Sequence, residues 1–265
     1  MNAPHDVDVL VVGAGHAGCE AALAAARLGA RVALVTLHLD AIAQMSCNPS
    51  IGGLGKGQLV REIDALGGAM GRCIDATGIQ FRTLNGSKGP AVQSPRAQAD
   101  KKEYQFWMKH LVETTPGIVV YMDEVTDLLV ENGTLRGARL ALRGDVVARA
   151  VVLSTGTFLA GRIHIGANMS DGGRHMEASA TRLSDALRRL GLPVLRMKTG
   201  TPPRIHADSV DYSRMSEQPG DIPPRPFSFL TDRIDRPQLS CWMTHTCEAT
   251  HRIVTMALDR APIFS

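Results

Sequence analysis

Six residues near the amino terminus, Gly13, Ala14, Gly15, His16, Ala17 and Gly18, have the G-x-G-x-x-G spacing of a phosphate-binding turn. In such a turn the first glycine permits a tight bend and the second lets backbone approach a pyrophosphate. The third lets the following helix lie close to the preceding strand. The amides at the start of that helix then face the phosphate charge. All six residues are therefore candidate cofactor-binding positions for a dinucleotide.

The segments on either side of this turn are those that the motif requires. Residues 7–12 form an apolar run typical of a strand buried on both faces, and residues 32–35 form a returning strand. Between them an alanine-rich stretch favours helix, and Gly29 provides its stop. An acidic residue for a ribose hydroxyl is missing at the end of the second strand, where Thr36 stands with Asp40 four residues on. We expect adenosine recognition through a hydroxyl, through backbone or through Asp40.

A second glycine-rich stretch, residues 45–57 (MSCNPSIGGLGKG), carries Cys47 beside Asn48 and Pro49. Glycines let backbone lie against a flat ligand, and loops on a nucleotide-binding scaffold commonly carry chemistry. We therefore expect a long loop with a chemical role between residues 37 and 57.

Composition indicates a globular protein, with 265 residues and 44% hydrophobic content. No apolar run reaches the length of a membrane span and no secretory signal precedes the first strand, so we expect a cytoplasmic protein without an anchor. Five cysteines, odd in number and irregular in spacing, fit reduced thiols. Net charge is +3, with nine basic against five acidic residues over 45–110 and eight against four over 174–214. This charge permits a polyanionic partner, but solvated helix faces explain it equally well.

Several further elements are predicted from periodicity. Residues 59–70 have helical spacing of apolar side chains, which we expect in the core, with Gly67 and Gly68 ending the helix. Residues 78–97 are polar, turn-rich and unsuited to an independent core, and their Arg82, Lys88 and Arg96 are candidates to face phosphates or a substrate. A helix over 96–113 should place the stripe of Tyr104, Trp107, Met108 and Leu111 in the core.

The next elements indicate the fold class. A strand over 118–122 precedes three short strands, 125–130, 135–142 and 146–150, which read as an antiparallel meander. The meander leads into VVLSTGT, an apolar strand that ends at Thr155 and Gly156. This order is the layout of two-dinucleotide-binding-domain flavoproteins, so we predict an α/β, FAD-binding Rossmann-like fold with a meander crossover. The resemblance of VVLSTGT to their A-T-G motif favours FAD over NAD in the first site and adds Thr155 and Gly156 to its candidate residues.

The carboxyl-terminal third is less regular. We expect a helix over 178–190, a short strand over 193–197 and irregular structure over 202–237, which holds seven of the 14 prolines. Cys241, His245, Cys247 and His251 follow within eleven residues, but their C-x5-C and H-x5-H spacings are not those of a zinc knuckle. We therefore predict no metal site.

Four segments together carry a specific resemblance, and they cover nearly the whole chain. They are residues 8–30, residues 45–100, STGTFLAGRIHIG and KTGTPPRI. The chain resembles the amino-terminal part of the glucose-inhibited division protein A family, the tRNA uridine 5-carboxymethylaminomethyl modification enzymes. This resemblance implies an FAD enzyme that acts with a tRNA-modification GTPase on C5 of wobble uridine, with NADH as reductant. It further implies a homodimer and a heterotetramer in the full-length family.

The resemblance also assigns residues. Gly13 to Gly18 would bind the FAD pyrophosphate, Val125 would contact the adenine end, and Cys47 would be the family's first essential cysteine. A thiol could add to C6 of uracil, which makes C5 nucleophilic, or could transfer a proton. Both roles remain open.

Three departures from the family pattern matter. The family is more than twice this length, its second essential cysteine and NAD motif lie beyond residue 265, and a serine that contacts FAD in the family corresponds to Ala180, next to Ser179. We expect residues 1–200 to be the FAD-binding half and residues 201–265 the start of an inserted nicotinamide or substrate domain. A truncated chain of this kind is expected neither to retain flavin nor to turn over.

Two alternatives remain. One is a folate- and FAD-dependent tRNA uracil-5-methyltransferase, against which the CNPSIGGLGKG loop argues. The other is an inactive nucleotide-binding fragment. A disulfide reductase is excluded because Cys47 is followed by Gly52 where C-x4-C requires a second cysteine.

Overall fold

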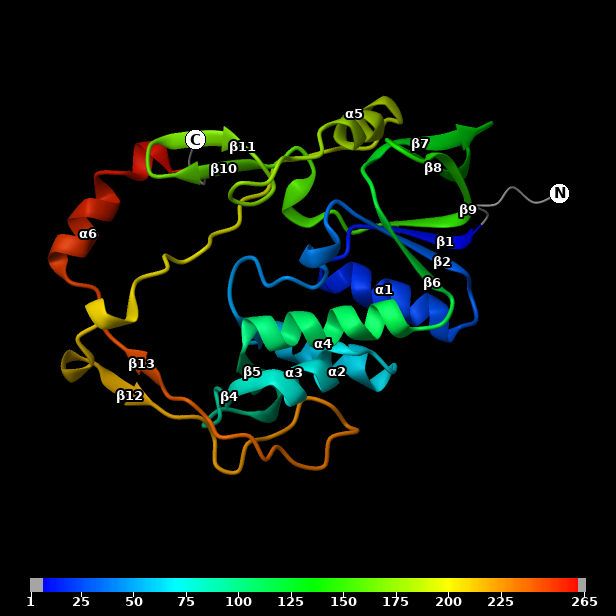
Figure 1. Ribbon diagram of the computed structural model, residues 1–265. Coiled ribbons are helices and arrows are strands. Elements are labelled where there is room, and N and C mark those ends of the chain that lie inside the picture. The colour runs from blue at the N-terminus through cyan, green and yellow to red at the C-terminus, as the bar shows by residue number, and fades with distance from the viewer. Residues whose placement is uncertain (1–6, 262–265) are drawn as a thin grey trace.

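A six-stranded mixed sheet carries the glycine turn in the computed structural model, which describes residues 7–261 (Figure 1). The outer ends of the two predicted domains, residues 1–6 and 262–265, lie outside the described residues. The strand order is β6-β2-β1-β9-β8-β7. Strands β6, β2, β1 and β9 are parallel to one another, whereas β8 is antiparallel to both of its neighbours, β9 and β7. The bounds are β1 Val7–Val12, β2 Val32–Thr36, β6 Ile118–Met122, β7 Val125–Glu131, β8 Thr134–Leu140 and β9 Gly144–Leu153.

The predicted meander is confirmed, but its last strand and the strand before Thr155 are one continuous element. The first half of β9 pairs antiparallel with β8, and its second half pairs parallel with β1, from Ala148 opposite Val7 to Leu153 opposite Val12. The carboxyl ends of β1 and β9 therefore meet at the same edge of the sheet. This register brings the Thr155 turn against the glycine turn.

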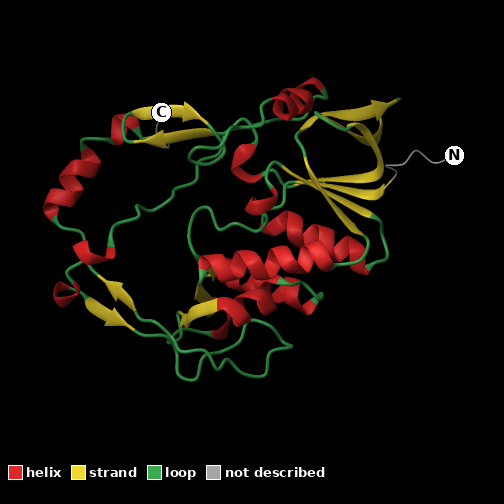
Figure 2. Ribbon diagram, viewed as in Figure 1, coloured by secondary structure: helices red, strands yellow, loops and turns green. Residues whose placement is uncertain are grey.

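Two hydrophobic cores lie on opposite faces of this sheet. Figure 2 shows the helices beside the sheet. Successive strand residues point to opposite faces, so Val11 and Leu34 enter the core beneath helices α1 (His16–Arg27) and α4 (Lys101–Thr114). Leu10 and Val35 enter the core shared with β7, β8 and helix α5 (Arg182–Arg189). Strands β1 and β2 are thus covered on both faces, as their apolar runs predicted.

A smaller unit is inserted between β2 and β6. It contains α2 (Lys56–Ala65), α3 (Met70–Thr77) and a three-stranded antiparallel sheet of order β3-β5-β4. Its strands are β3 Ser50–Gly52, β4 Gly78–Leu84 and β5 Ser94–Ala99. Residues 78–97, expected to be turn-rich, therefore contain two strands. Both edges of β4 are bonded: one pairs with β5, and on the other the amides of Asp221 and Leu239 donate to the carbonyls of Phe81 and Ile79.

Two helix predictions in this unit need correction. Helix α2, which corresponds to the apolar spacing over residues 59–70, ends at Ala65, and Gly67 beyond it has a φ of +86°. The expectation that its apolar side chains lie in the core holds for Val60, which is buried, but not for Leu59 and Leu66, which are exposed. Helix α4 begins at Lys101 rather than near residue 96, because β5 continues to Ala99 and the Asp100 side chain caps the helix. Tyr104 and Met108 are fully buried, with Trp107 and Leu111 packed against the same core, as predicted.

Two carboxylates, the half-buried Glu20 and the buried Asp75, join segments that are distant in sequence. Glu20 of α1 accepts the amides of Ala69 and Met70 at the start of α3. Asp75 of α3 accepts the amides of Phe227 and Ser228, each at 2.8 Å. The segment around Phe227, which is itself buried, is therefore fixed to the inserted unit.

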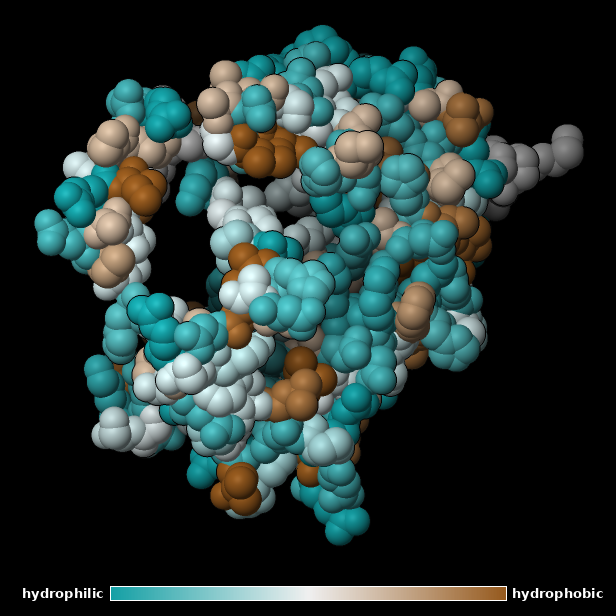
Figure 3. Space-filling model, turned by 60° about the vertical axis from the view of Figure 1, so that its left-hand side comes forward, coloured by the Kyte–Doolittle hydropathy of each residue, from teal (hydrophilic) through white to brown (hydrophobic). Residues whose placement is uncertain are grey.

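The carboxyl-terminal part forms an arm that curves away from the sheets, with an open gap between α6 and the rest of the molecule (Figure 3). Residues 193–197 form no strand because no neighbouring strand pairs with them, and α5 is shorter than predicted. The hairpin of β10 and β11 was missed. The remaining elements are β10 Arg162–Ile165, β11 Asn168–Asp171, β12 Ser216–Gln218, β13 Cys241–Met243 and α6 Glu248–Thr255.

Residues 7–261 contain neither a membrane-spanning helix nor a cluster of metal ligands. No helix there has the length and apolar character needed to cross a bilayer. No group of three or more His, Cys, Asp and Glu side chains in the same range is arranged to hold a metal ion.

Candidate dinucleotide cleft

A cleft of about 170 Å³ lies at the carboxyl ends of β1, β2 and β9. Open α/β sheets bind ligands at this edge. Of the residues predicted to bind a cofactor, Gly13, Ala14, Gly15, Val125, Thr155 and Gly156 line the cleft. His16, Ala17, Gly18 and Cys47 do not line it.

The three glycines of the turn have three different surroundings. Gly13 has a φ of +98°, and its amide donates to the Val35 carbonyl at 2.8 Å. A Cβ on Gly18 would press against the Gly13 carbonyl oxygen and lie 2.8 Å from Ser154 Oγ. A Cβ on Gly15 would meet no atom within 4 Å. The outer glycines therefore permit the backbone packing, whereas Gly15 leaves open the space that a pyrophosphate would need.

Ser154 joins the two turns of the cleft, a role that the sequence analysis missed. Its amide donates to the Val12 carbonyl at 2.8 Å, and its hydroxyl lies 3.0 Å from the carbonyl oxygens of both Val12 and Gly13. Its position immediately before Thr155 was the available signal. These hydrogen bonds of Ser154, which we call the Ser154 brace, fix the Thr155 turn relative to the glycine turn.

The amino terminus of α1 is suited to an anion. Its first-turn amides have no intrahelical acceptors, no side chain of its cap residue bonds them, and the first turn holds no acidic residue. The ring of His16 packs edge-on against Tyr104, with 5.5 Å between centroids, and burial lowers the pKa of its imidazole. His16 Nδ1 has no hydrogen-bond partner among residues 7–261. We therefore expect His16, Ala17 and Gly18 to contribute backbone amides rather than side chains.

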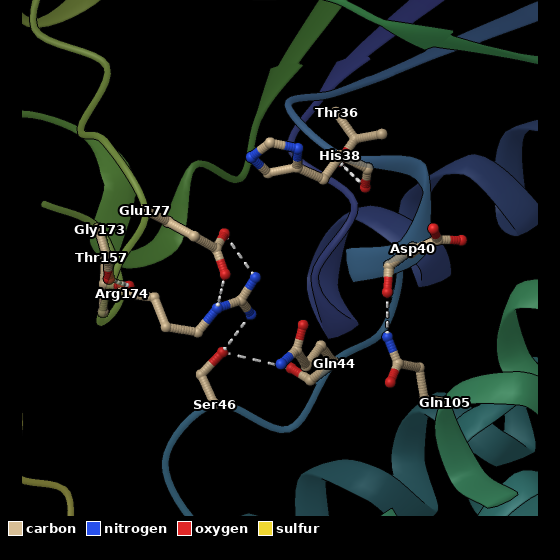
Figure 4. A network of polar contacts seen from close by, with 10 residues as sticks. All are labelled: Thr36, His38, Asp40, Gln44, Ser46, Gln105, Thr157, Gly173, Arg174 and Glu177. Carbon is tan, nitrogen blue, oxygen red and sulfur yellow. Dashed lines mark hydrogen bonds and ion pairs between the residues drawn. The ribbon is translucent and has the colours of Figure 1, made fainter. Parts of the chain in front are cut away.

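Asp40 does not line the cleft. Its side chain is 97% exposed, pairs with Lys109 at 2.7 Å, and points away from the cleft (Figure 4). Thr36 Oγ1 donates to the His38 carbonyl at 3.2 Å. Thr36 and His38 both line the cleft, with Val125 on the same lining. Of the options raised by the sequence, the hydroxyl and backbone contacts have candidate groups in this lining.

The Cys47 thiol lies beside the cleft rather than in it. The side chain is half-buried, and its sulfur donates to the Gly200 carbonyl oxygen at 2.8 Å. Arg204 donates to the Cys47 carbonyl at 2.7 Å, so the 198–204 segment holds this residue from one side. Ser46, the preceding residue, lines the cleft. The thiol is thus not enclosed in aliphatic packing.

A polar network that the sequence analysis did not predict borders the cleft (Figure 4). Arg174 forms a two-bond contact with Glu177, at 2.6 and 2.7 Å, and this contact lowers the pKa of the Glu177 carboxyl. The third guanidinium nitrogen of Arg174 donates to Ser46 Oγ at 2.9 Å. Thr157 Oγ1 donates to the Gly173 carbonyl at 2.6 Å. Residues more than 100 positions apart therefore meet at the rim of the cleft.

Ala180 lines the cleft as well, although it stands where the resemblance places a serine. Its amide donates to the Phe158 carbonyl and its own carbonyl accepts from Ala160, both at 2.8 Å. Backbone therefore fixes this position, and its side chain supplies no hydroxyl.

Together the parallel strands, the glycine turn and the braced Thr155 turn define a Rossmann-like α/β protein of the dinucleotide-binding class. The profile of the family described as glucose inhibited division protein A matches residues 8–265. The chain belongs to this family.

Curated relatives agree with the profile. The chain is 55% identical over 258 residues to the tRNA uridine 5-carboxymethylaminomethyl modification enzyme MnmG of Geobacter sulfurreducens, covering 97% of this chain and 41% of that protein. It is 53% identical over 273 residues to the enzyme of the same name from Rhodopirellula baltica, covering 98% and 42%. The chain thus spans about two fifths of the length of these relatives.

Solved structures give the same result. The structure superimposes on Aquifex aeolicus GidA with a TM-score of 0.93 and 49% identity, covering 98% of this chain and 44% of that chain. A GidA-related protein from Thermus thermophilus matches with a TM-score of 0.51 and 27% identity, over 69% of this chain and 68% of that one.

Proposed function

We propose that this chain is the FAD-binding amino-terminal part of an enzyme that adds a carboxymethylaminomethyl group to C5 of the wobble uridine in tRNA. The observation that carries the proposal is identity above 50%, over 97% or more of the chain, to relatives named for this reaction. Residues 1–200 would form the FAD-binding half, and residues 201–265 would begin the domain for nicotinamide or substrate.

The cleft fits the pyrophosphate of FAD. The uncapped helix start above Gly15, the open space at that glycine and the absence of an acidic first-turn residue all favour a bound phosphate. Val125, Thr155 and Gly156 line the same cleft and are our further cofactor-binding residues. Bound FAD would supply electron and hydride transfer chemistry, with NADH as the proposed reductant.

Cys47 is the proposed catalytic residue. Its thiol would act on the uracil ring, either by adding to C6, which shifts electron density to C5, or by transferring a proton. The half-buried position beside the cleft rim supports this role, because a reactive thiol must be accessible to substrate. The hydrogen bond to the Gly200 carbonyl fixes the sulfur position.

The proposed partners follow from the names of the relatives and from the family resemblance. They are tRNA and a tRNA-modification GTPase, with a homodimer of the full-length protein forming a heterotetramer with the GTPase. A tRNA substrate implies a cytoplasmic location. The basic surplus over residues 45–110 and 174–214 is compatible with an RNA partner.

Replacement of Cys47 by Ser tests the proposal in a form that carries the downstream residues of the relatives. Cells that lack their own copy of the enzyme would be supplied with the wild-type or the C47S form, and tRNA nucleosides would be analysed by mass spectrometry. We expect the modified uridine with wild type and its absence with C47S, while both purified proteins keep the flavin spectrum. Modified uridine with C47S would refute the catalytic role, and 5-methyluridine as the wild-type product would favour the methyltransferase alternative.

A further inference from the structure

Contacts from two different segments hold the loop that carries Cys47. The 198–204 segment contacts Cys47 itself, through the Gly200 carbonyl and the Arg204 guanidinium. Arg174 donates to Ser46 Oγ at 2.9 Å. Cys47 is therefore held through its own side chain and backbone, and through the side chain of the residue before it.

Arg174 is itself rigidly held, which distinguishes it from a surface arginine. Only 15% of its side chain is exposed, and two of its nitrogens form the paired contact with Glu177. Its guanidinium carbon lies 5.5 Å from the centre of the Phe158 ring. An arginine that is held by a planar two-bond contact loses little further entropy when its remaining nitrogen binds Ser46.

The backbone just before Arg174 is hydrogen-bonded to a residue that lines the cofactor cleft. Thr157 bonds the Gly173 carbonyl, and a Cβ on Gly173 would press into the ring of Phe158, so this turn lies directly on the segment after Gly156. Arg174, Glu177 and Ser46 all line the cleft. The side chain thus spans from the second turn of the cleft to the thiol loop.

We infer that Arg174 is a positioning residue that fixes the Cys47 loop at the rim of the cleft through Ser46, with Glu177 holding its guanidinium in place. The importance of this role for catalysis rests on the proposed function, because only there does Cys47 act on a substrate. The mechanical role of Arg174 in holding the loop does not depend on it.

The rate at which iodoacetamide alkylates Cys47 in the 265-residue chain tests the inference, since a loop held in place shields a thiol that donates to a carbonyl. Peptide mass spectrometry would follow each cysteine separately, with the exposed Cys247 as an internal reference. Ser46→Ala and Arg174→Gln each break the same contact from opposite ends. Loss of one charge-assisted hydrogen bond should raise the Cys47 rate at least about threefold in both variants and leave the Cys247 rate unchanged.

Two further variants separate positioning from general loosening. Arg174→Lys keeps the charge but loses the fork that Glu177 requires, so it should give an intermediate rate. Arg162→Lys alters an arginine paired with Asp171 in the β10 and β11 hairpin and should behave as wild type. A Cys47 rate that stays at the wild-type value in both S46A and R174Q would overturn the inference. An equal rise at Cys247 would overturn it too.

The full-length form distinguishes this inference from the proposed function. If Arg174 positions the thiol, R174K should lower kcat for tRNA modification, measured per FAD-loaded enzyme, with little change in KM. A faster Cys47 alkylation with an unchanged kcat would leave the positioning role intact and instead contradict the catalytic role of Cys47.

Discussion

Gly18→Ala would place a methyl group between the start of α1 and the glycine turn. The added Cβ would press on the Gly13 carbonyl oxygen, 2.8 Å from Ser154 Oγ and 2.9 Å from the Gly13 carbonyl carbon. Two of these three atoms belong to backbone that is held by the sheet, so the helix must shift. Overpacking of this kind costs about 1–3 kcal/mol, and contact with fixed backbone places Gly18→Ala near the upper end, at about 3 kcal/mol.

The effect is measurable by thermal unfolding followed by circular dichroism. For a chain of this size each kcal/mol lowers Tm by about 2–4 °C, so a fall of about 6–12 °C is expected. Gly15→Ala is the matched control, because its Cβ meets nothing within 4 Å and its φ of −73° suits any residue. An equal fall in both variants, or no fall in Gly18→Ala, would refute the argument that Gly18 is required for close packing.

Two further predictions concern the carboxylates of Asp75 and Glu20. Asp75→Asn replaces an oxygen that accepts a backbone amide by a nitrogen that cannot, so we expect a loss of about 1–3 kcal/mol in urea unfolding and faster proteolysis near Phe227. Glu20→Gln tests a pH effect, because burial raises the pKa of the Glu20 carboxyl from 4.5 despite the opposing amides of Met70 and Ala69. The folded state therefore binds this proton more tightly than the unfolded chain does, and its contribution to stability falls as pH rises from 4.5 through the folded pKa. Urea unfolding between pH 4 and pH 7 should show this fall in wild type relative to Glu20→Gln, and parallel profiles would contradict the assignment.

The unit from β1 to β2 could be predicted because its signals are local. An apolar run, three glycines and an alanine-rich helix each constrain the chain within a few residues. Strands β4 and β5 could not be predicted in this way. The buried Gln80 side chain donates to the Gln218 carbonyl, and the Phe81 carbonyl accepts a hydrogen bond from the amide of Asp221. One edge of β4 is therefore bonded by residues about 140 positions away, while its other edge pairs with β5. Residues 193–197 show the reverse case, a local strand pattern without a neighbour to pair with.

The candidate site likewise contains residues that local sequence motifs predict and residues that only the folded structure brings together. The glycines at 13, 15 and 18 and the Thr155 turn were accessible from motif spacing, and most of them line the cleft. The brace at Ser154 and the link from Arg174 to Ser46 depend on register and on turns that meet only after folding. Asp40 was a reasonable candidate from its position, but Lys109 on α4 holds its carboxylate elsewhere.

The central claim is that an ADP-type dinucleotide binds above Gly15, and titration of FAD into the full-length form tests it most directly. Flavin fluorescence should show one FAD bound per chain in the wild-type protein and in C47S, since the thiol lies outside the cleft lining. Gly15→Ala should keep its fold and lose FAD, because its methyl group would occupy the space that the pyrophosphate needs. Wild-type affinity for FAD in a folded Gly15→Ala protein would contradict the account.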